Sequence, residues 1–243
     1  MPEQKTAQLA EDLFRREAAQ IVATLTAQLG THRLELAEDA VQESLVRALQ
    51  TWPYRGIPQN PAAWLTKTAK NFALDALRRE QNWQHKETQI TTEQERWLTQ
   101  ENESTNEGNF ADSTLRLIFV CIHPQLAIEA QLALALRIVC GLSPAEIAAA
   151  FLTREAAISK RLVRARQQIR ELRLPFAMPD KSELTERLDG VLATLYLLFN
   201  EGYKASAGSR LIREELCHEA IRLTQLLCEH PATAQPRALA ALA

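Results

Sequence analysis

The sequence predicts an all-α fold, with two small helical domains joined by a linker and followed by a C-terminal helical extension. Glycine occurs only seven times in 243 residues, whereas alanine and leucine are abundant, which favours helices with short connections over turn-rich β-structure. Apolar residues recur at helical spacing in several stretches, and a polar stretch separates the two main groups of helices. The apolar fraction of 46% and the charged fraction of 24% are those of an ordinary globular protein.

Residues 7–80 are predicted to form the first domain from three amphipathic helices. The first helix ends at Gly30, because glycine commonly follows a helix. Its apolar face carries Leu9, Leu13, Ile21, Leu25 and Leu29. The second helix runs from about Leu36 to Trp52, where Pro53 is expected to end it, since proline lacks an amide hydrogen and clashes with the preceding turn. Its inner face carries Ala37, Val41, Leu45 and Ala48.

The third helix opens at Asn60 and Pro61, because asparagine caps a helix with its side chain and proline suits the first helical position. We expect it to run to about Arg79. Its inner face carries Leu65, Ala69, Phe72 and Ala76, and the opposite face carries Lys67, Lys70, Asn71 and Arg78, with Asp75 at the border. Taken alone, that polar face is what any solvated helix presents. The acidic group Glu35, Glu38, Asp39 and Glu43 near the start of the second helix is equally ordinary, since acidic residues there suit the helix dipole.

Residues 81–112 differ from their neighbours in composition and are predicted to be a linker. They are rich in glutamine, glutamate, asparagine and threonine, and poor in aliphatic residues. Seven acidic and two basic side chains give this segment a net charge of −5.

Residues 113–174 contain the most specific local pattern. A helix is expected from about Pro124 to Cys140, ending at Gly141. Ser143 and Glu146 then have the spacing of a capping box, and Pro144 occupies the first helical position. This short helix is expected to end at about Ala150, with a break at Phe151 and Leu152 and a cap at Thr153 for a longer helix. Two such helices joined by a tight turn are typical of a helix-turn-helix.

The longer helix has one apolar and one basic side. Its apolar arc is Ile158, Leu162, Ala165 and Ile169, and its polar arc is Lys160, Arg164 and Gln167, flanked by Ser159 and Arg161. Residues 154–173 hold seven basic and two acidic side chains, a net charge of +5. Arginine and lysine on such a helix can donate to guanine edges in the major groove of DNA, so this helix is interpreted as a DNA-recognition helix.

Residues 180–243 are predicted to form further helices, and the apolar segment at 238–243 suggests a helical domain larger than this chain shows. The sequence contains no signal peptide and no apolar run long enough to span a bilayer, so a cytoplasmic location without membrane contact is expected. We find no glycine-rich phosphate loop and no catalytic motif, and therefore expect neither an enzyme nor a cofactor.

The cysteine and histidine pairs do not predict a metal site. Four scattered cysteines do not make a disulfide framework. Cys217 with His218 and Cys228 with His230 lie on one expected helix, which holds them ~16 Å apart, whereas zinc needs its ligands at ~2.0–2.3 Å. The pair of Cys121 and His123 is explained by a core thiol and a turn before Pro124.

The order of these parts resembles the extracytoplasmic-function group of bacterial RNA polymerase sigma factors. The resemblance rests on AEDAVQESLVRAL at 37–49, a Trp-Pro loop, NPAAWLTKTAKNFALDALRRE at 60–80, a linker, and a helix-turn-helix ending in RLVRARQQIREL at 161–172. It covers about residues 11–173. The segment LYLLFNEGYKAS at 195–206 resembles the subgroup that carries a C-terminal extension, and members of that subgroup are typically longer than this chain.

The resemblance implies two partners, core RNA polymerase and promoter DNA. It implies docking on the β′ clamp helices through Glu38, Asp39, Gln42 and Glu43, with the β flap as a second polymerase contact. It implies binding and melting of the −10 element by Trp64, Lys67, Lys70, Asn71, Asp75, Arg78 and Arg79, with Asn71 and Asp75 reading bases. It implies binding of the −35 element by Arg154, Ser159, Lys160, Arg161, Arg164 and Arg166. The acidic linker would follow the positively charged RNA-exit path of the polymerase.

The chain departs from the family pattern at the start of the recognition helix, where it has Glu155, Ala156 and Ala157, so base preference there stays open. We expect residues from about 180 onward to contact both domains and to set activity, alone or through a protein regulator. Two other functions compete with this interpretation. One is a stand-alone helix-turn-helix regulator that binds duplex DNA without polymerase, and the other is a helical adaptor whose basic helix meets an acidic partner.

Overall fold

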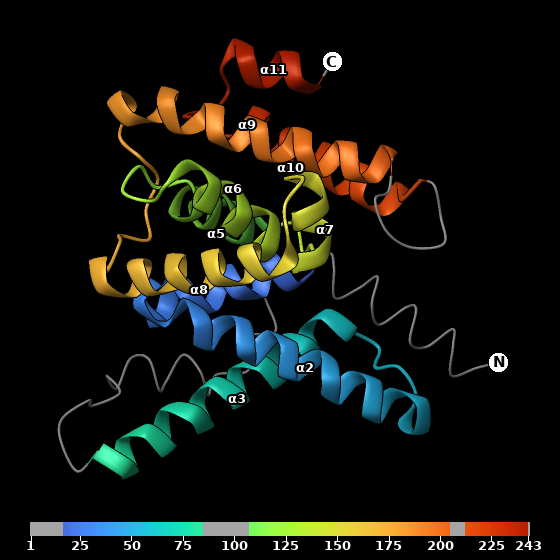
Figure 1. Cartoon of the computed structure of the whole chain (residues 1–243). Helices are drawn as coiled ribbons and strands as arrows, with labels where there is room; N and C mark the ends of the chain where they lie inside the picture. Colours follow the sequence, from blue (N-terminus) through green and yellow to red (C-terminus); the bar gives the residue numbers. More distant parts are fainter. Residues whose placement is uncertain (1–16, 85–106, 205–211, 243) are drawn as a thin grey trace.

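The computed structural model describes residues 17–84, 107–204 and 212–242, and every regular element in these ranges is a helix (Figure 1). The central part of the predicted linker, residues 85–106, lies outside the described residues, as do Leu9 and Leu13 of the first expected helix. The all-α prediction is confirmed. None of the described helices is long and apolar enough to cross a membrane.

The first group of helices comprises a helix through residues 17–29, the short 3-10 helix η1 (Thr31–Arg33), α2 (Leu34–Arg55) and α3 (Pro61–Gln84). Gly30 ends the first helix as predicted: its backbone φ is 86°, a value that favours glycine, and its amide donates to the Thr26 carbonyl over 2.9 Å. Helices α2 and α3 pack on one another and bury Val41, Leu65 and Ala69.

Helix α2 does not end at Pro53, contrary to the prediction. It continues through Pro53 to Arg55 and stops at Gly56, whose φ is 82° and whose amide donates to the Trp52 carbonyl over 3.0 Å. Both effects of proline, the missing amide hydrogen and the clash with the preceding turn, are local, and Pro53 lies in the last turn of α2, so the rest of the helix stays intact. Glycine, with its access to positive φ, is what ends this helix.

Helix α3 begins as the sequence predicts, because the Asn60 side-chain oxygen accepts a hydrogen bond from the Ala63 amide over 3.0 Å. It runs five residues beyond the expected end, to Gln84. Leu65 and Ala69 are buried, whereas Phe72 and Ala76 of the expected inner face are half-buried. Ala73, Leu74 and Leu77 are the buried residues in this part of α3 instead.

The second group comprises α5 (Glu107–Cys121), α6 (Ile128–Ile138), α7 (Pro144–Ala150) and α8 (Glu155–Leu172). Helix α5 begins inside the predicted linker and is buried on several sides at its C-terminal end, where Leu117, Phe119 and Cys121 are inaccessible. The helix expected from Pro124 begins only at Ile128, after a turn in which the Leu126 amide donates to the His123 carbonyl over 2.9 Å.

The extension comprises α9 (Lys181–Tyr203), α10 (Glu214–Glu229) and α11 (Pro236–Leu242). Helix α9 covers α5, α6 and α7, and α10 packs along α9 (Figure 1). Arg187 of α9 is buried and donates to the Phe119 carbonyl and, over 2.9 Å, to the Glu183 carboxylate. The extension therefore shares a core with the helix-turn-helix group.

Helix α8 is the member of the second group that faces the first group (Figure 1): it packs against α6 and α7 on one side and against η1 and α2 on another. Thr31 of η1 is buried and donates its hydroxyl to the Leu174 carbonyl just beyond α8. The recognition helix thus contacts the first domain directly.

Candidate nucleic-acid and polymerase-docking surfaces

The helix-turn-helix has the local geometry that the sequence predicts at its start. The Ser143 hydroxyl accepts from the Glu146 amide over 3.2 Å, and the Glu146 carboxylate accepts from the Ser143 amide over 2.6 Å, which is a complete capping box. The turn differs in one respect, because Arg154 rather than Thr153 is the residue that caps α8, without a side-chain hydrogen bond. Leu152 adopts a left-handed φ of 51° in this turn.

Helix α8 presents a basic surface of the kind a major groove accepts. Its apolar arc is fully buried as predicted: Ile158, Leu162, Ala165 and Ile169. Lys160 and Arg164 are exposed, and so are Ser159 and Arg154. Arg161 is half-buried, with its guanidinium 5.9 Å from the centre of the Phe151 ring, a cation–π arrangement that orients the side chain at the turn.

Arg166 does not belong to this exposed surface. Its guanidinium donates two hydrogen bonds to the Glu38 carboxylate of α2, over 2.7 and 2.8 Å, and its side chain is only 16% exposed. Burial lowers the pKa of Arg166, but the hydrogen bonds and charge of Glu38 outweigh it, so the pKa is raised overall. In this structure one expected DNA-binding residue and one expected polymerase-binding residue are partners of each other.

Because of the Glu38–Arg166 contact, only part of the acidic side of α2 remains exposed. Glu38 is buried, whereas Asp39 and Gln42 remain exposed. Glu43 is half-buried and accepts from Arg47 on its own helix over 2.9 Å. Arg170 of α8 pairs with Glu35, an ion pair in which both side chains are about half exposed.

Helix α3 carries a polar face that is exposed except at one residue. Lys67, Asn71, Asp75, Arg78 and Arg79 are accessible, and Arg79 donates to the Asp75 carbonyl over 3.1 Å. Trp64 is half-buried, its ring meeting that of Trp52 edge to face with centroids 5.5 Å apart.

Lys70 is the exception, and its placement on the exposed face is wrong. The side chain is buried, and burial lowers the pKa of its ammonium group. Lys70 directly follows the core residue Ala69 and is itself 5% exposed. It therefore does not share the exposed face of α3 with Lys67, Asn71 and Arg78.

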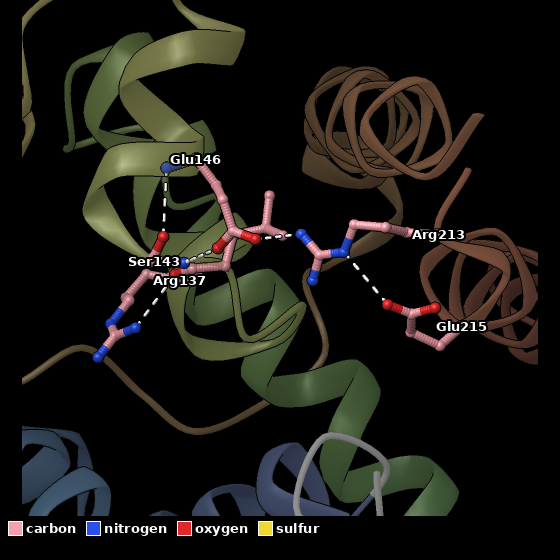
Figure 2. Close-up of polar contacts among 6 residues, drawn as sticks. Arg137, Ser143, Glu146, Arg213 and Glu215 are labelled. Carbon is pink, nitrogen blue, oxygen red and sulfur yellow. Dashed lines mark hydrogen bonds and ion pairs between the residues drawn. The ribbon is translucent and has the colours of Figure 1, made fainter. Parts of the chain in front are cut away.

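The sequence did not reveal the contact that ties the extension to the helix-turn-helix (Figure 2). Arg213, at the start of α10, donates to the Glu146 carboxylate of the capping box and to Glu215 over 3.2 Å. The side chains of Arg213 and Glu146 are 11% and 15% exposed. Burial raises the pKa of Glu146, but the hydrogen bonds from Ser143 and the pairing with Arg213 outweigh it and lower the pKa overall.

Of the paired cysteines, Cys121 lies in the core, whereas Cys217 and Cys228 are partly buried and His218 is exposed. Cys121 and Cys140 are fully buried, and burial raises the pKa of both thiols. Among the described residues no group of three or more potential ligands could hold a metal ion. The polar surfaces on α3, α2 and α8 are the candidate functional sites, and their exposed charged and polar side chains can bind a macromolecule.

Comparison with known families matches three segments of the chain. Residues 12–83 match Sigma-70 region 2 and residues 116–169 match Sigma-70 region 4. Residues 187–243 match a family of unknown function (DUF6596). An uncharacterized protein of Rhizobium meliloti (strain 1021) is 42% identical over 215 residues, which is 86% of this chain and 50% of the relative. The chain thus spans about half the length of that relative. No matching solved structure was found.

The two sigma matches fall on the two helical groups that carry the polar surfaces. Region 2 contains α2 and α3, and region 4 contains the helix-turn-helix and most of α8. The region 4 match is of the type found in extracytoplasmic-function factors. The chain belongs to the sigma-70 family, as a factor of the extracytoplasmic-function type with a C-terminal helical extension.

Proposed function

We propose that this protein binds core RNA polymerase and directs promoter-specific initiation of transcription, as a non-catalytic factor working beside the polymerase in the cytoplasm. The observation that carries the proposal is the presence of two separate exposed surfaces that could bind DNA in one chain: the polar face of α3 in region 2 and the basic face of α8 in region 4. A repressor that binds one duplex site needs only the second.

The proposed roles follow from exposure and chemistry. Asn71 and Asp75 are short polar side chains suited to reading the Watson–Crick edge of an unstacked base, and Lys67, Arg78 and Arg79 supply positive charge for the DNA backbone. On α8, Lys160 and Arg164 are placed for base edges, with Ser159 beside them. Arg154 is proposed to contact the sugar-phosphate backbone of the DNA, where phosphate contacts position the domain.

The test is a binding comparison with purified components. Sigma-free core polymerase, promoter-containing duplex DNA and the protein are mixed pairwise and together, and complexes are separated by gel filtration. We expect a stable complex with core polymerase, and promoter binding that depends on the polymerase. Stable binding to a duplex site with no association to core polymerase would favour the stand-alone regulator, and binding to neither core polymerase nor DNA would favour the adaptor.

The Asn71→Ala variant is expected to lose promoter melting at particular −10 sequences while retaining binding to core polymerase. The amide of Asn71 can both donate to and accept from a base edge, and alanine can do neither. Permanganate footprinting on a panel of −10 variants measures the melting. Equal melting by wild type and variant on every −10 sequence would contradict a base-reading role.

The Arg164→Ala variant is expected to lose ~1–3 kcal/mol of binding free energy for the preferred −35 sequence and to become indifferent at one base pair. Fluorescence anisotropy of the polymerase complex on single-base −35 variants measures both effects. Arg154→Ala is the matched control, since loss of a backbone contact weakens all sequences alike and reduces the salt dependence. A uniform loss for Arg164→Ala as well would make Arg164 a phosphate contact.

A further inference from the structure

The C-terminal extension holds the first turn of α7, the first helix of the helix-turn-helix, through Arg213 (Figure 2). We propose that Arg213 is a positioning residue for −35 recognition, which holds α7 through Glu146 so that α8 can enter the major groove. The −35 half of this proposal rests on the proposed function, whereas the positioning of α7 by the extension does not.

Arg213 is itself fixed where α9 and α10 meet. Its amide donates to the Gly202 carbonyl of α9 over 2.7 Å, and its carbonyl accepts from the Leu216 amide in the first turn of α10 over 3.0 Å. Its side chain is only 11% exposed and also donates to Glu215 over 3.2 Å. Because α9 and α10 pack along one another, the guanidinium extends from a defined point of the extension.

Glu146 is the residue of α7 on which the position of this helix depends most. Helix α7 has only seven residues, and helices this short are not stable without caps and packing. The Glu146 carboxylate accepts from the Ser143 amide over 2.6 Å and from the Arg213 guanidinium. Its side chain is 15% exposed, so removal of Arg213 would leave a largely buried carboxylate without this ionic partner.

A displacement of α7 would be passed on to the recognition helix. The two helices pack on one another, and the Thr153 amide of the turn donates to the Ala148 carbonyl of α7 over 2.9 Å. The ring of Phe151, directly after α7, lies 5.9 Å from the guanidinium carbon of Arg161 on α8. The position of α7 therefore affects the start of α8, which is the part of a recognition helix that contacts base edges.

Region 4 fixes the segment before α7 by its own contacts. Arg137 of α6 donates to the Leu142 carbonyl over 3.1 Å (Figure 2), and the Leu142 amide donates to the Leu136 carbonyl over 3.0 Å. These contacts hold the residue before Ser143, whereas Arg213 acts on the first turn of α7 itself. Loss of Arg213 is therefore expected to loosen α7 without unfolding the rest of region 4.

The first experiment measures amide hydrogen exchange of the full chain by mass spectrometry, without polymerase or DNA. In Arg213→Gln we expect exchange in residues 145–153 to become at least about tenfold faster, and exchange in α3 to stay unchanged. Unchanged exchange in residues 145–153 overturns the proposal, and so does an equal rise in α3, which would indicate general instability.

Arg237→Gln is the matched control for this experiment. Arg237 is also an arginine of the extension, and its guanidinium donates to Asp189 over 2.7 Å, but both side chains are 59% exposed. An exposed pair contributes little, so we expect exchange in residues 145–153 to stay as in wild type. A rise as large as that of Arg213→Gln would overturn the specific role of Arg213.

The second experiment measures −35 discrimination by the complex with core polymerase, using fluorescence anisotropy. Discrimination is the ratio of the affinity for a promoter to the affinity for the same promoter with a scrambled −35 sequence. Arg213→Gln is expected to lower this ratio about tenfold and to leave binding to DNA that carries only the −10 element unchanged. An unchanged ratio overturns the −35 role, and so does an equal loss of affinity for the −10 DNA.

Two further variants separate the ion pair from general packing. Arg213→Lys keeps the positive charge and is expected to restore the ratio to within about threefold of wild type, whereas a ratio as low as that of Arg213→Gln would overturn the role of the charge. Combining Arg213→Gln with Glu146→Gln is expected to lower the ratio no more than about twofold below Glu146→Gln alone, because both substitutions break the same pair. Additive losses would overturn the proposal.

The outcomes also distinguish this proposal from the proposed function. If wild type binds neither core polymerase nor a promoter in its presence, the proposed function fails. The positioning of α7 by Arg213 is then decided by hydrogen exchange alone.

Discussion

The Glu146→Gln variant is expected to lose about 3 kcal/mol of unfolding free energy, because it breaks a buried ion pair and weakens a helix cap together. The Glu146 carboxylate accepts from the Ser143 amide over 2.6 Å and from the Arg213 guanidinium. Glutamine keeps the shape but not the charge, so Arg213 retains only Glu215 as an ionic partner among the contacts described. Urea unfolding followed by circular dichroism measures the loss.

The same substitution is expected to change how stability depends on pH. The pKa of Glu146 is lower in the folded protein than its ordinary value of 4.5. Its contribution is therefore fully present above pH 4.5 and is lost as the pH falls through the folded pKa. Wild type should lose this contribution in acid, whereas Glu146→Gln lacks it at every pH, so the difference between the two proteins narrows in that range.

Glu215→Gln is the matched control for this prediction. It removes the same charge from the same Arg213, but the Glu215 side chain is 37% exposed, so the expected loss is under about 1 kcal/mol. Hydrogen exchange should show faster exchange at α7 amides only for Glu146→Gln. Equal losses of unfolding free energy in Glu146→Gln and Glu215→Gln would mean that the capping box does not depend on the extension.

The Gly202→Ala variant is expected to lose about 2 kcal/mol of unfolding free energy, although alanine is the better helix former. Gly202 lies in α9, and a Cβ there would sit 2.8 Å from the Cys217 amide nitrogen, 2.7 Å from its Sγ and 3.1 Å from the Arg213 carbonyl oxygen. The backbone atoms can move away only if α10 shifts along α9. Thermal and urea unfolding measure the loss.

Asn200→Ala controls for helix propensity, because Asn200 is exposed on the same helix two residues earlier. It should be neutral or slightly stabilising, since alanine favours a helix by a few tenths of a kcal/mol over asparagine. If Gly202→Ala were stabilising by about 1 kcal/mol, as propensity alone predicts, the close approach of α9 and α10 would be contradicted.

Contacts between the extension and region 4 determine how the expected role of the extension can be tested. Helix α9 buries Arg187 against Phe119, and Arg213 completes the surroundings of Glu146, so the extension stabilises region 4 from two sides. Deleting all residues after Arg173 would expose the part of the region 4 core that α9 covers. The resulting loss of stability could not then be distinguished from a loss of regulation. Point variants at Glu146 and Gly202 separate the two.

The features that the sequence predicted well are those determined by neighbouring residues. The capping box needs only Ser143 and Glu146, three residues apart, and the start of α3 needs only Asn60 and Pro61. The buried arc of α8 follows from helical spacing alone and is confirmed at all four positions. Local chemistry decides such features, so they can be derived without knowing what packs where.

The features that were wrong or missed depend on packing between distant parts of the chain. Glu38 and Arg166 lie 128 residues apart and Glu146 and Arg213 lie 67 apart, so no spacing rule brings either pair together. Lys70 is buried although helical spacing places it on the polar face, so spacing along one helix does not decide its burial. The prediction that Pro53 ends α2 follows the rule for helix interiors, whereas Pro53 lies in the last turn of α2, which tolerates proline.

The ion pairs between α2 and α8 show where opposite charges of the sequence meet in the fold. The net charge of −2 includes an acidic linker at −5 and a segment around the recognition helix at +5, and the rest of the chain contributes −2. Part of the basic charge on α8 is neutralised internally by Glu35 and Glu38 of α2. The charge left exposed, at Lys160 and Arg164, is the part proposed to meet DNA.

The most direct test of the proposed function is run-off transcription with sigma-free core polymerase on a pool of genomic fragments, followed by mapping of the transcript starts. We expect transcript starts that require the protein and share a −35 and a −10 sequence at constant spacing upstream. We also expect Asn71→Ala and Arg164→Ala to alter which of these starts are used. Starts identical to those of core polymerase alone would contradict the proposed function.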